Sequence, residues 1–172
     1  MDKIGRILIV DDDDMVLDAM QETFIDDYDI VVARSGTEAI GILAEDLEFD
    51  TVILDIRMAR MDGLKTADRI KEIMPELPII FHTGHAGSYS QEDIDKEYQP
   101  FDFVTKNEPP VRLRRSVRNA VTSHRLSTSA HDLIDNARSQ YKMVGKSKVM
   151  REVYSRIELI GPTDSKVMIL GP

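Results

Sequence analysis

The stretch ILIVDDDD, residues 7–14, places four apolar side chains directly before four carboxylates. The apolar half is typical of a short buried strand in a parallel sheet. Two carboxylates about 4 Å apart repel each other by roughly 4 kcal/mol at a protein-like dielectric. Because four of them destabilise the end of a buried strand, we expect a bound cation to offset the repulsion.

Composition limits the classes of protein to which the chain can belong. Of its 172 residues, 42% are hydrophobic and 31% charged, as in a soluble globular protein. The chain has no cysteine, which excludes disulfides and thiolate metal sites. No apolar run approaches the roughly 18 residues of a membrane span, and the N-terminus is not typical of a signal peptide. We therefore expect a cytoplasmic protein without membrane contact.

Charge is unevenly distributed along the chain. Residues 1–110 carry a net charge of −16 and residues 111–172 carry +7. A basic segment can bind nucleic acid, but no Phe, Tyr or Trp lies between the arginines of residues 112–125, and no helix-turn-helix pattern is visible. We favour a solvated linker face and expect this chain to bind no nucleic acid.

Five short apolar runs alternate with amphipathic stretches over the first 125 residues. The runs are RILIV (6–10), DIVVA (29–33), TVILD (51–55), PIIFH (78–82) and FDFVT (101–105). Each is mostly β-branched or aromatic, which favours buried strands of a parallel sheet. The sequence therefore predicts an α/β fold of (βα)5 type, with a doubly wound, parallel five-stranded sheet.

The stretches between these runs carry helix signals. Ser35 and Glu38 are placed as a capping box before a helical stripe that extends to Leu47. The fifth helix is expected to begin at the Pro-Pro pair 109–110 and to carry an apolar stripe to about residue 121.

The alternation of apolar runs and amphipathic stretches ends at about residue 125. We expect a first domain at 1–125, a polar linker at 126–142 with room for some helix, and the start of a second α/β domain at 143–172. In the last segment, Ser147 is placed to cap a helix, and KVMIL (166–170) is typical of a strand. One helix and one strand bury too little apolar surface for a stable domain, so we expect a piece of a longer protein.

Polar side chains stand at the ends of four predicted strands. Asp11 and Asp12 follow the first strand, Asp55 ends the third, Thr83 follows the fourth and Lys106 follows the fifth. Such strand ends converge on one crevice of an open parallel sheet. The carboxylates suit Mg²⁺, and a hydroxyl with a cation suits stabilisation of a phosphoryl group held on Asp55.

The same strand allows a second interpretation. An apolar strand followed by Asp-x-Asp also fits a hydrolase of the haloacid-dehalogenase-like type, with Asp11 as the nucleophile. That family expects Gly-Thr or a similar pair where this chain has Asp14-Met15, and we find no later acidic pair after a strand for its metal. Asp13 and Asp14 are instead expected at the start of the first helix, where negative charge is favourable.

At these residues the chain resembles the receiver domain of bacterial two-component response regulators, over roughly residues 4–125. ILIVDDDD, TVILDIRMARMDG, FHTGH and FDFVTK resemble the family's acidic pair, phosphoacceptor loop, switch threonine and lysine strand, in that order. The resemblance implies a flavodoxin-like fold and a sensor histidine kinase as partner. It implies no catalysis beyond Mg²⁺-dependent phosphorylation and dephosphorylation of the chain itself.

The resemblance also implies roles for individual residues. Asp55 would be the phosphoacceptor and Lys106 the phosphoryl-binding cation, while Thr83 and Phe103 would form the switch pair. The Mg²⁺ ligands would be Asp11, Asp12, Asp55 and the main-chain carbonyl of Arg57, with Asp12 a direct ligand.

The chain departs from the family pattern at several positions. Asn107 and Ala59 stand where proline is common, and Phe103 replaces the more usual tyrosine. Asn107 in particular leaves open a pseudo-receiver that acts by protein contact alone. Arg57 and His85 are bulky residues that we expect to slow the attack of water on the phosphoryl group.

Residues 143–172, MVGKSKVMREVYSRIELIGPTDSKVMILGP, resemble the beginning of the ATPase domain of sigma-54-dependent transcription activators. There such a strand leads into a GxxxxGK[ST] phosphate loop, of which Gly171 would be the first glycine. The resemblance implies a parent ATPase that acts with sigma-54 RNA polymerase on DNA, whereas this chain alone is expected not to bind ATP. We also expect a homodimer, because the fifth helix carries an apolar stripe beside five arginines. Up to about Val121, packing of this stripe on the sheet explains it at least as well.

Overall fold

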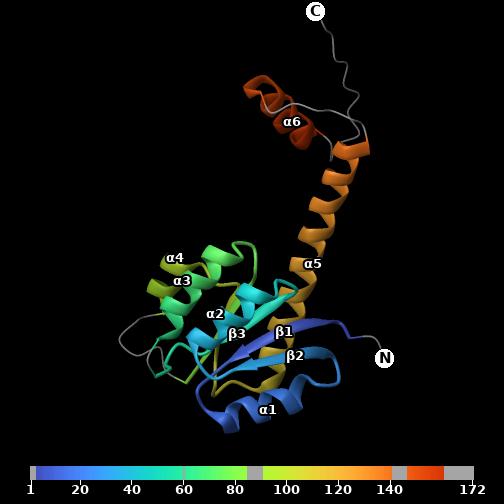
Figure 1. The fold of residues 1–172 in the computed structure, drawn as a ribbon. Coiled ribbons are helices and arrows are strands. Elements are labelled where there is room, and N and C mark those ends of the chain that lie inside the picture. Colours follow the sequence, from blue (N-terminus) through green and yellow to red (C-terminus); the bar gives the residue numbers. More distant parts are fainter. Residues whose placement is uncertain (1–2, 60, 85–90, 141–146, 161–172) are drawn as a thin grey trace, which may run out of the picture. The chain divides into compact units, whose positions relative to one another are not determined.

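The computed structural model describes residues 3–59, 61–84, 91–140 and 147–160. By its internal contacts the chain divides into two compact units, Met1–Ala130 and His131–Pro172. The strands are β1 (Gly5–Val10), β2 (Tyr28–Ala33), β3 (Thr51–Leu54), β4 (Ile79–Thr83) and β5 (Asp102–Thr105) (Figure 1). The helices are α1 (Asp14–Phe24), α2 (Gly36–Glu45), α3 (Gly63–Ile73), α4 (Gln91–Tyr98), α5 (Pro110–Gln140) and α6 (Lys148–Ile160).

The five strands form one parallel sheet in the order β2-β1-β3-β4-β5. The chain runs outward from β1 to β2, returns to β3 on the other side of β1, and continues to β5. The strand order therefore reverses between β1 and β3, which is the point where ligands bind in doubly wound sheets. The predicted (βα)5 fold with a parallel five-stranded sheet is confirmed.

Helices cover both faces of the sheet (Figure 1). Because side chains alternate along a strand, the core divides into two apolar clusters. Leu8 and Leu54 belong to the cluster that includes residues of α2 and α3, and Ile9 and Ile53 belong to the cluster that includes residues of α1 and α5. Burial on both faces explains why the strands read as continuous apolar runs.

Side-chain caps define the beginnings of the first two helices. Asp13 lies at the start of α1, as predicted, and caps the helix by accepting a hydrogen bond from the N–H of Met15 at 2.9 Å. Ser35 caps α2 by accepting from the N–H of Glu38 at 3.2 Å. The Glu38 carboxylate accepts from the N–H of Arg34 at 2.7 Å. The return bond of the predicted capping box therefore reaches one residue further back than Ser35.

The predicted extension of α2 to Leu47 is wrong. The helix ends at Glu45, and Asp46 takes up an extended conformation with φ −141° and ψ 117°. The Asp46 carboxylate pairs with the guanidinium of Arg6 at 2.6 Å, which favours this departure from the helix. Leu47 consequently lies outside the stripe and is 58% exposed.

α5 is longer than the sequence predicts. We expected a polar linker from residue 126, but the helix continues to Gln140. The segment lacks an apolar stripe, yet it contains no proline or glycine to end a helix. The hydroxyls of Thr122 and Thr128 donate to carbonyls four residues earlier, at 2.8 and 3.0 Å, and so do not compete for the helical N–H groups. The domain limits 1–125, 126–142 and 143–172 stay predictions.

In the second unit, α6 begins where the sequence predicts. The Ser147 hydroxyl accepts a hydrogen bond from the N–H of Met150 at 3.3 Å. The predicted strand at 166–170 and Gly171 lie outside the described residues. Among the described helices, none is long and apolar enough to cross a membrane.

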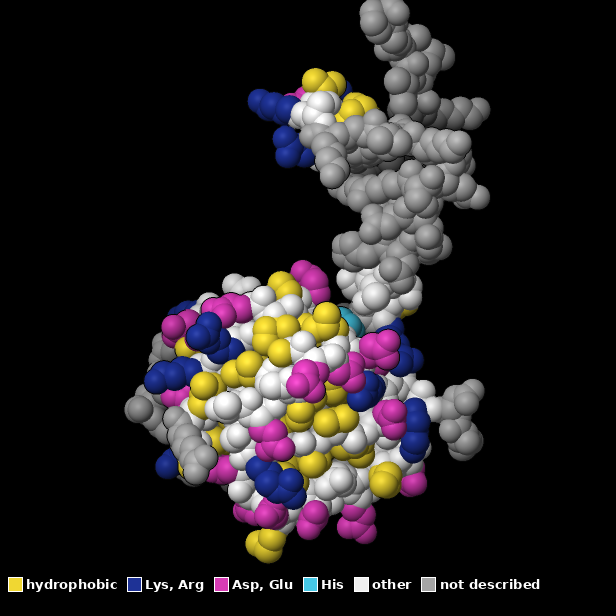
Figure 2. Space-filling view, in the orientation of Figure 1, with side chains coloured by type: hydrophobic (Ala, Val, Ile, Leu, Met, Phe, Trp, Pro, Cys, Tyr) yellow, Lys and Arg dark blue, Asp and Glu magenta, His cyan; other side chains and the backbone are white. Residues whose placement is uncertain are grey.

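Charges of both signs mix on the surface of the first unit. On the face shown in Figure 2, Lys and Arg side chains lie among Asp and Glu side chains. Two exposed ion pairs of this unit join Arg34 to Asp14 and Arg69 to Glu72, each at 2.7 Å. The acidity of the first 110 residues is therefore partly balanced by local contacts.

Candidate functional site

The carboxyl ends of β1, β3 and β5 bring three carboxylates and a lysine together. Single carboxylate oxygens of Asp11, Asp12 and Asp55 lie within 4.8 Å of one another. Asp11 and Asp55 are 1% and 5% exposed, whereas Asp12 is exposed. The Lys106 ammonium lies 2.7 Å from Asp11 Oδ2 and 2.9 Å from Asp55 Oδ2. The structure thus joins four of the predicted site residues in one cluster.

Main-chain groups hold the two buried carboxylates. The N–H groups of Asp11 and Asp55 donate to the ends of neighbouring strands, which fixes both residues to the sheet. Asp11 Oδ1 accepts from the N–H of Asp13 at 3.0 Å, and Asp55 Oδ1 accepts from the N–H of Arg57 at 3.2 Å. One oxygen of each carboxylate is held by its own loop, and the other faces Lys106.

Burial and pairing act against each other in this cluster. Burial raises the pKa of Asp11, while the Lys106 ammonium and the N–H of Asp13 oppose the rise. Burial alone would lower the pKa of Lys106, but its contacts with Asp11 and Asp55 outweigh burial and raise it. Lys106 is therefore charged at neutral pH, and it pairs with two of the three carboxylates.

The donor set fits a magnesium ion. Asp11 is buried, and its Oδ2 pairs with the Lys106 ammonium at 2.7 Å. Asp12 is exposed, so the cluster is accessible to solvent. Its Oδ2 accepts a hydrogen bond from the N–H of Ala59 at 2.8 Å. A proline at position 59 would lack this donor. Hard oxygen ligands at an accessible edge, with negative charge in excess, are what Mg²⁺ prefers.

The two residues of the predicted switch pair lie on neighbouring strands. Thr83 ends β4, is 1% exposed, and its carbonyl accepts from the N–H of Lys106 at 3.0 Å. Phe103 of β5 is opposite Phe81 of β4 and is buried in the cluster that includes residues of α2 and α3. Their part in switching stays a prediction.

The chain is similar to known proteins of one family. The family model described as the response regulator receiver domain matches residues 7–118. The chain belongs to the response regulator receiver family. The chain is 32% identical over 174 residues to the transcriptional regulatory protein ZraR of Klebsiella oxytoca. It is 31% identical over 180 residues to the C4-dicarboxylate transport transcriptional regulatory protein DctD of Rhizobium meliloti.

These alignments cover 96% and 99% of this chain, but the chain spans only 37% and 38% of the two relatives. A receiver domain protein from Clostridium thermocellum superposes with a TM-score of 0.65 at 28% identity, covering 71% of this chain and 98% of that chain. NtrX from Brucella abortus in complex with ATP gives a TM-score of 0.67 at 27% identity, covering 94% of this chain and 36% of that chain. The similarity therefore extends past the receiver into the segment that follows it.

Gly63 shapes the receiver's site in a way that we did not predict from the sequence. It is the first residue of α3, and its N–H donates to the carbonyl of Ile56 at 2.7 Å. A Cβ at this position would lie 2.0 Å from the main-chain oxygen of Asp55, so α3 can begin this close only with glycine. The signal in the sequence is a glycine directly after Asp62, which caps α3.

The loop after Lys106 closes without the family's usual proline. The N–H of Glu108 donates to the carbonyl of Thr105 at 3.0 Å, and the Glu108 carboxylate accepts from the N–H of Thr105 at 2.9 Å. This reciprocal pair fixes the turn that contains Asn107.

Of the two residues expected to shield the site, Arg57 is exposed and His85 lies outside the described residues. The assignment of the Arg57 carbonyl as a metal ligand stays a prediction.

Proposed function

We propose that this receiver accepts a phosphoryl group on Asp55 from a sensor histidine kinase, with Mg²⁺ held by Asp11, Asp12, Asp55 and the main-chain carbonyl of Arg57. The observation that carries the proposal is the buried Asp55 carboxylate, 2.9 Å from the Lys106 ammonium and grouped with two further carboxylates. Membership of the receiver family supports phosphorelay signalling as the class of function.

The chain's own groups suit the transfer of a phosphoryl group. Asp55 Oδ1 is oriented by the N–H of Arg57, and Oδ2 faces Lys106. In the transfer, a carboxylate oxygen of Asp55 forms a bond to phosphorus as the bond from phosphorus to the kinase's histidine nitrogen breaks. The Lys106 ammonium is placed to stabilise the phosphoryl oxygens, and Thr83 supplies a hydroxyl on the adjacent strand. Mg²⁺ would add positive charge on the same oxygens.

The downstream role follows from the relatives. They are transcriptional regulatory proteins by name, and their similarity covers nearly the whole of this chain. Phosphorylation of Asp55 then changes the contacts made near Thr83 and Phe103 and so controls an ATPase of the parent protein. In this proposal the parent acts in the cytoplasm with sigma-54 RNA polymerase on DNA, and the receiver itself binds no nucleic acid.

Homodimerisation is part of the proposal, but not through the apolar stripe that the sequence suggests. That stripe is buried in the first unit and consists of Leu113, Val117, Ala120 and Val121. Two other apolar side chains of α5, Val111 and Leu126, are 70% and 66% exposed. Light scattering with and without a phosphate mimic tests the dimer, and a monomer under both conditions would remove it.

Intact-mass spectrometry tests the phosphorylation itself. With acetyl phosphate and Mg²⁺, the chain should gain the mass of one phosphoryl group, and Asp55→Ala should abolish the gain. Asp68→Ala, an exposed aspartate of α3, is the matched control and should leave the gain intact. Equal modification of the Asp55→Ala variant contradicts the proposal.

A further inference from the structure

The three carboxylates of the cluster are held in different ways. Asp11 and Asp55 are buried, and each accepts a hydrogen bond from the N–H two residues further on, within its own loop. Asp12 is exposed, and its Oδ2 accepts from the N–H of Ala59, 47 positions along the chain. At 2.8 Å this bond is shorter than those of Asp11 and Asp55, at 3.0 and 3.2 Å. The exposed carboxylate of the cluster is therefore held from a second loop, the one that follows β3.

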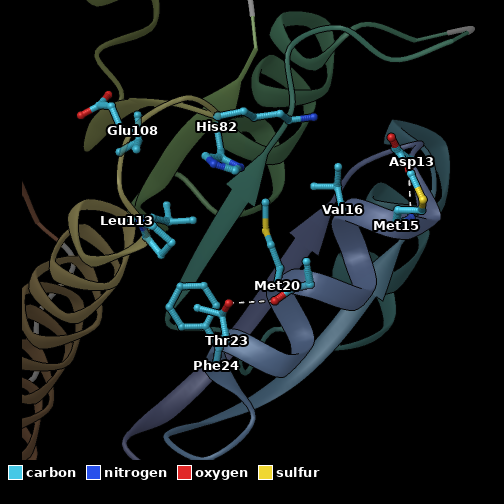
Figure 3. A pocket seen from close by; sticks show the side chains of 13 residues that line it. Asp13, Met15, Val16, Met20, Thr23, Phe24, His82, Glu108 and Leu113 are labelled. Carbon is cyan, nitrogen blue, oxygen red and sulfur yellow. Dashed lines mark hydrogen bonds between the residues drawn. The ribbon is translucent and has the colours of Figure 1, made fainter.

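The main chain on both sides of Asp12 is fixed by local hydrogen bonds. The Asp11 carboxylate accepts from the N–H of Asp13, and the Asp13 carboxylate accepts from the N–H of Met15 at the start of α1 (Figure 3). These contacts place the Asp12 main chain, but none of them orients its side chain. An exposed side chain can adopt several rotamers. The bond to Ala59 therefore favours the rotamer that joins Asp12 to the cluster.

The loop that carries the donor is itself held in place. The N–H of Gly63 donates to the carbonyl of Ile56 at 2.7 Å, which fixes the loop near its beginning to the start of α3. Arg57, whose main-chain carbonyl is a proposed Mg²⁺ ligand, lies in this loop between Ile56 and Ala59. The bond from Ala59 to Asp12 thus connects the loop of one proposed ligand to the side chain of another.

The identity of residue 59 decides whether this bond can form. Proline has no N–H to donate, and Ala59 stands where the receiver family commonly has proline. The alanine therefore supplies a donor that the usual residue lacks. A carboxylate has about four lone-pair sites on its two oxygens, so one N–H leaves Asp12 able to bind a metal ion as well.

We propose that the main-chain N–H of Ala59 is a positioning group, which holds the exposed Asp12 carboxylate in the arrangement that binds Mg²⁺. The inference rests on the proposed Mg²⁺ site and adds how one of its ligands is oriented. The apparent affinity for a ligand falls with the fraction of the protein that is in the binding-competent arrangement. By raising that fraction, the bond from Ala59 raises the affinity of the chain for Mg²⁺.

Calorimetric titration of the full, unphosphorylated chain with Mg²⁺ tests the positioning. Ala59→Pro removes the N–H and should raise the Kd for Mg²⁺ by about three- to fivefold, as expected for one lost hydrogen bond at an exposed site. Ala59→Ser keeps the N–H and should bind Mg²⁺ as tightly as the wild type. Equal Kd values for the wild type and Ala59→Pro, or an equal loss in both variants, overturn the positioning and leave the Mg²⁺ site standing. A wild-type chain that binds no Mg²⁺ overturns both.

A measurement on the wild-type chain stands even if Ala59→Pro does not fold. Coupling between two equilibria is reciprocal, so a bond that favours Mg²⁺ binding is itself strengthened when Mg²⁺ binds. Exchange of the Ala59 amide hydrogen with water, followed by NMR, should therefore slow by about the same three- to fivefold when Mg²⁺ saturates the chain. Faster exchange would mean that the ion draws Asp12 away from Ala59, and unchanged exchange would mean that the two are uncoupled. Either result overturns the proposal.

Discussion

Asp12 and Asp13 are adjacent carboxylates with different surroundings. Asp12 belongs to the acidic cluster, whereas Asp13 caps α1 by accepting from the N–H of Met15. We expect Asp12→Asn to weaken Mg²⁺ binding by roughly tenfold or more, because it removes a charged ligand. Asp13→Asn should change the affinity little, since asparagine also caps helices. Calorimetric Mg²⁺ titration measures both, and equal losses would show the assignment to be wrong.

Replacement of glycine by alanine should have opposite effects on the free energy of unfolding at positions 63 and 41. Gly63→Ala pushes a Cβ against the main chain of Asp55 and should lower the free energy of unfolding by roughly 1–3 kcal/mol. It should also weaken Mg²⁺ binding, because the loop after Asp55 must shift. Gly41 lies within α2 with no atom near its Cβ position, so Gly41→Ala should stabilise by about 1 kcal/mol. Urea denaturation gives both values, and destabilisation by both would contradict the steric argument.

Residues at strand ends could be predicted from sequence, whereas residues that act through shape could not. Asp11, Asp55 and Lys106 each follow an apolar run, and parallel strands bring such ends together. Gly63 acts by the absence of a Cβ near the main chain of Asp55, and this closeness exists only in the folded chain. His82 is a polar residue within an apolar run of the sequence. Nothing in the sequence shows that its Nδ1 lacks a hydrogen-bond partner among the described residues.

Beyond its buried apolar stripe, α5 is held to the sheet by an ion pair between Arg125 and Asp50. The Arg125 guanidinium donates to both oxygens of Asp50, at 2.9 and 3.0 Å, and the N–H of Arg6 donates to the same carboxylate at 2.8 Å. Arg125 is half-exposed, so the pair contributes about 1 kcal/mol at most.

Arg125→Ala should therefore loosen the part of α5 that follows Val121. Hydrogen exchange of the amides at 122–130 should quicken by up to about fivefold, the equivalent of 1 kcal/mol. Arg115→Ala is the matched control, because Arg115 is an exposed arginine of the same helix outside this contact. Unchanged exchange in Arg125→Ala would mean that the apolar stripe alone holds the helix.

The lengths of elements were less predictable than their order. Leu47 fits the helical spacing of α2, but the contact between Asp46 and Arg6 joins residues 40 positions apart and takes the chain out of the helix. α5 continues past residue 125 although its polar side chains show no stripe, because no helix-breaking residue interrupts it. Local patterns therefore located the elements, and long-range contacts set where α2 ends.

At the scale of the whole molecule, the strand order places the site. β1 and β3 are neighbours although α1, β2 and α2 separate them along the chain, so Asp11 and Asp55 end adjacent strands. β5 lies two positions beyond β3, and the long side chain of Lys106 reaches both carboxylates from there. Three strands far apart in sequence thereby supply one cluster, where we propose that a cation and a phosphoryl group bind together.

The position of the acyl phosphate decides whether Asp55 is the phosphoacceptor. After incubation with acetyl phosphate and Mg²⁺, borohydride reduction converts a phosphorylated aspartate into homoserine, and peptide mass spectrometry locates the converted residue. We expect homoserine at position 55 alone, and none when Mg²⁺ is chelated. Homoserine at position 11 would contradict it and favour a hydrolase with Asp11 as nucleophile.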